Sequence, residues 1–214
     1  MNVKLCQGFL FGALTLAANI AAAGAILSPT AVVGNTMGTA SGGGSTTNLI
    51  NQTGLSSGFV SGVTDFASYI ASNPTHASLN PSNAWAGAPG PVLGDLDFDL
   101  GNVYSLGSFA FWSQSNTNAI NSFTLFSAFD ASFSGAVDLG TFSASVLNPI
   151  TVQVFSAPST AQFVRLRVNS NHGGNNVNIG EVAFDVSAAV PSPGPLALMG
   201  LGIAGIGYWR RKQI

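Results

Sequence analysis

Histidine and glutamate are the residues of this chain best suited to acid–base chemistry, and there are few of them. The 214 residues include two histidines, His76 and His172, and one glutamate, Glu181. Histidine acts as a general acid or base near neutral pH. However, no Gly-x-Ser-x-Gly motif accompanies them, and a single glutamate offers no obvious carboxylate pair for glycoside hydrolysis. The sequence therefore favours a protein that is not an enzyme, with a secreted hydrolase as an alternative.

Three aspartates, Asp95, Asp97 and Asp99, alternate with apolar residues. An EF-hand calcium loop starting at Asp95 needs glycine at its sixth position and glutamate at its twelfth, where this chain has Leu100 and Leu106. In a strand the three carboxylates share one face and the leucine and phenylalanine side chains share the other. This pattern predicts a solvated strand face above a core face, and calcium held by the aspartate row remains an alternative.

Aromatic and amide side chains in loop-like sequence are candidates for ligand binding. Aromatic faces stack on sugar rings, and asparagine-rich loops provide adaptable hydrogen bonds. Trp85 lies in one such loop, and Asn171, His172 and Asn175 lie in the polar stretch NSNHGGNN. In a β-sandwich the loops gather at the ends of the sheets, so these four residues form a candidate ligand site. Trp112 follows a strand-like run and is expected to be buried.

The elements that would position these residues are short strands. Between Ile26 and Ala189 the apolar residues occur in alternating or continuous runs separated by Gly, Asn, Ser and Pro, which indicates strands. Their spacing predicts an all-β fold, an antiparallel β-sandwich or jelly roll. The expected strands are 96–100, 108–112, 121–126, 137–142, 150–155, 163–168 and 181–186.

The strand 163–168 separates two kinds of side chain. Alternation places Val164, Leu166 and Val168 on the core face, and Arg165 and Arg167 on the other. Residues 169–178 are expected to form a loop before the last strand, with Gly173-Gly174 adopting unusual backbone angles.

Composition excludes some classes of partner. Only 7% of the residues are charged, and the chain between the terminal segments carries eight acidic residues against two arginines, a net charge of −6. Such a surface repels phosphate backbones, so no nucleic acid partner is expected. The one cysteine, Cys6, lies in the N-terminal segment, so the body contains no disulfide.

Both ends of the chain have the character of membrane-targeting segments. Lys4, an apolar stretch and small residues offering Ala21-Ala22-Ala23 or Ala23-Gly24-Ala25 for cleavage predict a secretory signal peptide over residues 1–25. At the other end, residues 196–209 form a short glycine-rich apolar segment, predicted as a short transmembrane helix. The basic cluster Arg210, Arg211 and Lys212 should remain in the cytoplasm.

The C-terminal segment 190–214 begins with a proline motif, Val190, Pro191, Ser192, Pro193 and Gly194, which is followed by the apolar segment and the basic cluster. This arrangement resembles the PEP-CTERM sorting signal of exopolysaccharide-producing Gram-negative bacteria. Ser192 stands where that family usually has glutamate. The resemblance implies transient anchoring in the inner membrane, cleavage by the sorting protease exosortase, and release to the cell surface or extracellular matrix. An ordinary weak tail anchor is the alternative.

The body 26–189, with LDFDLGNVYSLGSFAFW and the FVRLRV strand before a closing strand that begins at Glu181, resembles discoidin-like, galactose-binding-like jelly rolls. That resemblance implies a structural calcium between an early loop and the closing glutamate, with Asn51, Thr53 and Glu181 as its ligands. Asn51 stands where aspartate would be expected. The alternative is that Glu181 pairs with Arg165 or Arg167.

Together these observations predict an exported, surface-sorted, non-enzymatic β-sandwich of the exopolysaccharide or biofilm matrix. Its expected function is weak carbohydrate binding or adhesion, and its expected partners are exosortase and a surface glycan. A purely structural matrix protein without a discrete ligand site is the alternative.

Overall fold

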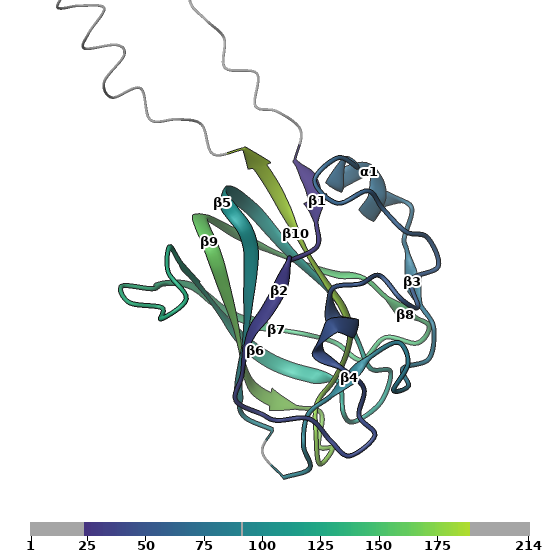
Figure 1. Ribbon diagram of the computed structural model, residues 1–214. Coiled ribbons are helices and arrows are strands. Elements are labelled where there is room, and N and C mark those ends of the chain that lie inside the picture. Colours follow the sequence, from purple (N-terminus) through teal and green to yellow (C-terminus); the bar gives the residue numbers. More distant parts are fainter. Residues whose placement is uncertain (1–23, 91, 189–214) are drawn as a thin grey trace, which may run out of the picture.

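The computed structural model describes residues 24–90 and 92–188, which form an all-β antiparallel sandwich (Figure 1). The first strands and the two short helices precede the long strands in the chain. They are β1 (Ala25–Leu27), β2 (Ala31–Asn35), the 3-10 helix η1 (Thr46–Leu49), α1 (Phe66–Ala71), β3 (Thr75–His76) and β4 (Trp85–Ala86). The second half contains β5 (Gly94–Ser113), β6 (Ile120–Ala128), β7 (Val137–Ser143), β8 (Ile150–Thr151), β9 (Gln153–Asn171) and β10 (Asn178–Ala188).

The main sheet has the strand order β1-β10-β5-β9-β6-β7, with β2 on β5 and β4 on β10. The long strands β5 and β9 take part in both layers. The first half of β5 pairs with β2 and with the second half of β9, whereas its second half pairs with β10 and with the first half of β9. The register is interrupted between Asp99 and Tyr104, around Gly101, whose φ is +85°. Both strands are strongly curved (Figure 1) and so join the two layers.

Aromatic side chains fill the space between the layers. Phe98 packs edge-on against Phe184, and Phe109 packs against Phe123, so each pair joins strands of the two layers. All four rings are at most 1% exposed. Burying rings of this size supplies a large share of the hydrophobic stabilisation.

The aspartate row and the two arginines form a ladder between β5 and β9. Arg165 donates from Nε and Nη2 to the two carboxylate oxygens of Asp97 at 2.7 and 2.8 Å, and Arg167 bonds Asp95 in the same way at 2.8 and 3.0 Å. Asp95, Asp97 and Asp99 share the face of β5 opposite Leu96, Phe98 and Leu100, as predicted, but this face is paired with arginines and partly buried, so the prediction that it is solvated is wrong. Asp97 is only 7% exposed. Both arginines form their ion pairs with aspartates of β5, and among the described residues neither pairs with Glu181, so the alternative pairing of Glu181 with Arg165 or Arg167 is wrong.

The strands expected from the sequence correspond to β5, β6, β7, β9 and β10, with two differences. Ranges 96–100 and 108–112 belong to one strand, β5, and range 150–155 is divided between β8 and β9. Trp112 is fully buried, as expected, and the expected loop 169–178 is shortened to residues 172–177 because β9 continues to Asn171.

β1 begins at Ala25, one residue before the expected start of the body, and lies beside the end of β10.

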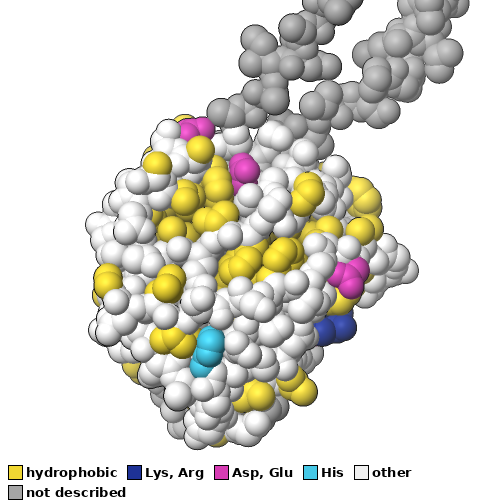
Figure 2. Space-filling model, turned by 180° about the vertical axis from the view of Figure 1, so that it is seen from behind, with side chains coloured by type: hydrophobic (Ala, Val, Ile, Leu, Met, Phe, Trp, Pro, Cys, Tyr) yellow, Lys and Arg dark blue, Asp and Glu magenta, His cyan; other side chains and the backbone are white. Residues whose placement is uncertain are grey.

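Within residues 24–90 and 92–188 no helix is long and apolar enough to cross a membrane. Residues 1–23 of the predicted signal peptide 1–25 lie outside the described residues, whereas Gly24 and Ala25 belong to the folded domain. The predicted segment 190–214, with the sorting motif and the basic cluster, also lies outside the described residues. On the face shown in Figure 2, charged side chains are sparse among uncharged polar and apolar surface.

Candidate functional site

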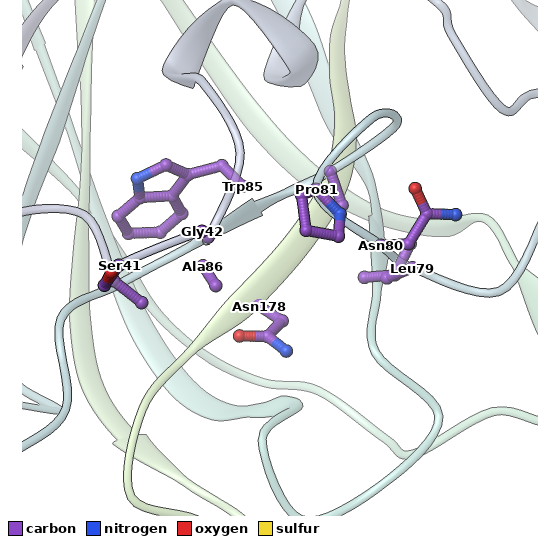
Figure 3. A pocket seen from close by; sticks show the side chains of 11 residues that line it. Ser41, Gly42, Leu79, Asn80, Pro81, Trp85, Ala86 and Asn178 are labelled. Atoms are coloured by element: carbon purple, nitrogen blue, oxygen red, sulfur yellow. The ribbon is translucent and has the colours of Figure 1, made fainter.

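A cavity of about 250 Å³ lies beside the start of β10. Figure 1 shows that β10 begins at the end of the sandwich opposite the end where β1 begins. The cavity walls come from three parts of the chain: the loop 40–43, the segment 79–86 that leads into β4, and Asn178 at the start of β10. Figure 3 shows Ser41 and Asn80 on opposite sides of the cavity, with Asn178 between them. The remaining lining residues are Ala40, Gly42, Gly43, Leu79, Pro81, Ala84, Trp85 and Ala86.

Backbone hydrogen bonds hold the two loops together. Ala40 donates to Ala86 O and Ala86 donates to Gly43 O, which extends the pairing of β4. Gly44 has a φ of +79°, and a β-carbon there would collide with Ala84 O, so glycine is required at this close approach. Asn48 in η1 donates from Nδ2 to the carbonyl oxygens of both Pro81 and Ala84. These bonds fix the cavity walls without any charged group.

The side chains that line the cavity are uncharged. Leu79, Pro81 and Ala86 supply apolar surface, while Asn80 and Asn178 supply amides. The Oδ1 atom of Asn178 is buried and has no hydrogen-bond partner among the described residues. Because an unpaired buried acceptor costs free energy, a ligand donor that reached it would be stabilised. The cavity therefore suits a small neutral ligand with hydroxyl or amide groups.

Trp85 is the one residue of the predicted ligand site that lines this cavity. Its side chain is fully buried, and its Nε1 donates to Thr39 Oγ1 at 2.9 Å. The indole therefore forms part of the cavity wall and does not offer an open face for stacking.

Asn171, His172 and Asn175 do not line the cavity. Asn171 donates to Gly174 O and Asn176 O and accepts from Gly173 N, so its side chain closes its own loop. Nε2 of His172 lies 3.1 Å from Ala144 O, and Asn175 contributes its carbonyl to Gly90 N. The structure does not bring the four predicted residues together around one opening.

Sequence reasoning missed Asn80, Pro81 and Asn178. Asn80 and Pro81 belong to the stretch SLNPSNAW, whose Asn-Pro pair indicates a turn. Asn178 was assigned to a loop, and its place in the cavity depends on the pairing of β10 with β4, where Asn178 lies opposite Ala86.

Glu181 lies in β10 beneath the loop 51–54. It is fully buried, its Oε2 accepts from Gln52 N at 2.6 Å, and its Oε1 has no partner among the described residues. Burial raises the pKa of Glu181 to about 9, against the smaller opposite effect of the Gln52 hydrogen bond. The carboxyl is therefore neutral at pH 7 in the metal-free protein.

The three predicted calcium ligands fit the ion poorly. Ca²⁺ takes six to eight oxygen ligands and favours several carboxylates. Here Glu181 has a free oxygen, but Asn51 and Thr53 are exposed, and Asn51 already accepts from Thr53 N and donates to Asn48 Oδ1. No group of three or more His, Cys, Asp or Glu side chains suited to a metal occurs in the described part of the chain. The calcium site stays a prediction. A neutral Glu181 carboxyl is sufficient to account for the single hydrogen bond from Gln52 N and the unpaired Oε1.

His76 is the second buried titratable group near this loop. Its ring is 4% exposed, Nδ1 lies 2.7 Å from Ala77 O, and Nε2 has no partner among the described residues. Burial lowers its pKa, so the imidazole is neutral at pH 7. Neither histidine lines the cavity, and no side chain that does is titratable.

Comparison with known proteins gives the class of fold. No family model matches the chain, and no curated protein matches it. Among solved structures, the C-terminal domain of a chitobiase from Bacteroides fragilis aligns with a TM-score of 0.54 and 16% identity, covering 77% of this chain and 99% of that domain. This likeness shows a shared β-sandwich fold.

Two further solved structures are carbohydrate-binding modules of the CBM32 type. One is GH31 CBM32-2 bound to GalNAc, with a TM-score of 0.49 and 16% identity over 72% of this chain and 95% of that one. The other is CpGH89CBM32-5 from Clostridium perfringens in complex with GalNAc-β-1,3-galactose, with a TM-score of 0.42 and 14% identity over 48% of this chain and 74% of that one. The alignment with the chitobiase domain confirms the expected β-sandwich fold, and the resemblance to discoidin-like, galactose-binding-like domains stays a prediction.

Proposed function

We propose that the body is a non-catalytic carbohydrate-binding domain whose ligand site is the cavity bounded by residues 40–43, residues 79–86 and Asn178. The observation that carries the proposal is the buried, unpartnered Oδ1 of Asn178 at a cavity whose side chains are uncharged. Sugar hydroxyls both donate and accept hydrogen bonds, as does the amide of Asn178, whereas the amide of Asn80 already bonds Ser78 O and Ser82 N within its own turn. A fold shared with a domain of a chitobiase supports the proposal.

The cavity is small and its one aromatic lining residue, Trp85, is fully buried, so binding should be weak and limited to one or two sugar units. Carbohydrate retention is measured first by glycan array and then by titration with the best ligand. Replacing Asn178 by alanine removes the buried acceptor, which should weaken binding about tenfold, equivalent to about 1.4 kcal/mol.

Asn175→Ala is the matched control, because Asn175 is an exposed asparagine outside the cavity. It should bind as the unchanged protein does. Equal loss in both variants, or none in Asn178→Ala, would contradict the proposed site. Absence of retention by every glycan would favour the structural matrix protein.

We further propose that the domain works outside the cell. Residues 1–25 would direct export, and residues 190–214 would hold the protein in the membrane until exosortase releases it to the exopolysaccharide matrix. The support comes from the sequence: the proline motif, the short apolar segment and the basic cluster. Fractionation of cells with and without an exosortase gene tests this proposal, since the protein should remain in the membrane fraction when the gene is absent.

A further inference from the structure

The end of the sandwich opposite the candidate ligand site contains an acidic group with no counter-charge among residues 24–90 and 92–188. Asp185 lies near the end of β10 and lines a second cavity of about 180 Å³ with Gly24, Ser105, Leu106, Gly107 and Ser187. Its carboxylate takes part in no side-chain hydrogen bond or ion pair among the described residues. Burial raises the pKa of Asp185, and the neighbouring Asp65 carboxylate raises it further.

No cation of the described chain is available to Asp185. The two cations within residues 24–90 and 92–188 are Arg165 and Arg167, and both are engaged in the ladder with Asp97 and Asp95. Asp65 is the N-cap of α1 and accepts from Ser68 N, so it adds negative charge to the site and no donor. The two carboxylates define a place where a positive group would be stabilised.

Gly24 is the residue against which Asp185 packs. A β-carbon at position 24 would overlap Oδ1 of Asp185, so only glycine allows the carboxylate to approach the backbone this closely. Gly24 O accepts from Phe66 N at 2.8 Å, and the next residue, Ala25, pairs with Val186 in β10. Residue 24 is therefore part of the folded domain.

The sequence offers two cleavage positions for a leader peptidase, each with small residues one and three positions before the cut bond. Cleavage after Ala25 would remove the Gly24–Phe66 hydrogen bond and the first pair of β1. Cleavage after Ala23 preserves both. Hydrolysis of the Ala23–Gly24 amide by water leaves a carboxylate on the leader and an α-amine on Gly24, which is protonated at neutral pH because such amines have pKa values of about 7.7 to 8.0.

We propose that the leader is removed between Ala23 and Gly24, and that the new α-ammonium of Gly24 forms an ion pair with Asp185. This inference depends on the proposed export and is independent of sugar binding. The ion pair would link the first residue of the mature protein to its last strand. Processing would then add a counter-charge that no described residue gives Asp185, which would stabilise the exported form.

The test uses the full chain expressed with its own leader in a Gram-negative host. Intact mass and N-terminal sequencing of the exported protein should give Gly24 as the first residue. A first residue of Ile26 would overturn the inference and leave export standing. An uncut chain would overturn the inference and the export proposal together, while sugar binding is measured separately on the same material.

The ion pair has its own readout, the pKa of the α-amine, measured by NMR after reductive ¹³C-methylation. A neighbouring carboxylate favours the charged amine, so this pKa should lie about one unit above its ordinary value. Asp185→Asn should return it to the ordinary value. Asp138→Asn, which removes an aspartate on β7, should leave it raised. Equal values in the unchanged protein and in Asp185→Asn would overturn the pair even if cleavage occurs at Gly24.

Discussion

Replacing Glu181 by glutamine should stabilise the protein at neutral pH. The glutamate pKa is raised from its ordinary value of 4.5 to about 9, so below pH 4.5 the carboxyl is protonated in both the folded and unfolded states. As the pH rises above 4.5, the unfolded chain loses this proton and the folded chain keeps it, so the free energy of unfolding falls. At about 1.36 kcal/mol per pH unit, the loss reaches about 3 kcal/mol at pH 7.

Glutamine is the matched substitution because its Oε1 can accept from Gln52 N as the glutamate does, but it has no proton to lose. At pH 7 Glu181→Gln should therefore have a free energy of unfolding about 3 kcal/mol above that of the unchanged protein, which corresponds to roughly 10 °C in Tm. At pH 4.5 the two proteins should be nearly equal.

The assay is urea unfolding in EDTA at several values between pH 4.5 and 8. The difference between the two proteins at each pH isolates Glu181, because the opposite effect of His76, whose pKa is lowered, is common to both. A difference that stays constant with pH would refute the buried neutral carboxyl. Calcium that stabilised the unchanged protein alone at pH 8 would instead establish Glu181 as a metal ligand.

Three further predictions concern stability. Arg165→Met leaves the nearly buried Asp97 carboxylate without its bidentate partner, and should lower the free energy of unfolding in urea by about 3 kcal/mol, with part recovered by adding Asp97→Asn. Gly54→Ala places a β-carbon 2.5 Å from Cε1 of His76 at a φ of +100°, so we expect a loss of about 2 kcal/mol, and unchanged thermal unfolding would show that the loop can relax. Phe109→Ala removes a fully buried ring between the layers and should cost about 3–5 kcal/mol, measured by calorimetry against the unchanged protein.

The sequence predicted the central strands because each is long enough for the apolar pattern to repeat. In β9 the alternation of Val164, Leu166 and Val168 with arginines is complete, and these three side chains are at most 1% exposed. β3, β4 and β8 contain two residues each, so no periodicity can identify them. Their strand geometry comes from partners far away in the chain, as when β4 pairs with the start of β10.

The candidate site was harder to predict for the same reason. Trp85 was identified by residue type, but its burial follows from packing beneath the loop 40–43, which composition does not reveal. Conversely, Asn171 has the residue type of a binding loop and uses its amide to close that loop. Whether an amide serves a ligand or its own backbone depends on distances that only the folded chain defines. For Asn80 the sequence does contain an indication of a loop position, because the Asn80-Pro81 pair is typical of a turn.

β10 connects the two proposals in space. Its first residue, Asn178, lines the candidate ligand cavity, and Asp185, near its last residue, lines the second cavity with Gly24. Any segment attached before Gly24 or after Ala188 therefore joins the sandwich at the end opposite the cavity. If residues 190–214 hold the protein at a membrane, as we propose, the attachment point lies at the end of the sandwich opposite the cavity and leaves the cavity open. The same ligand affinity should then be measured for the anchored and the released protein, whereas a cavity beside the attachment point would be blocked until release.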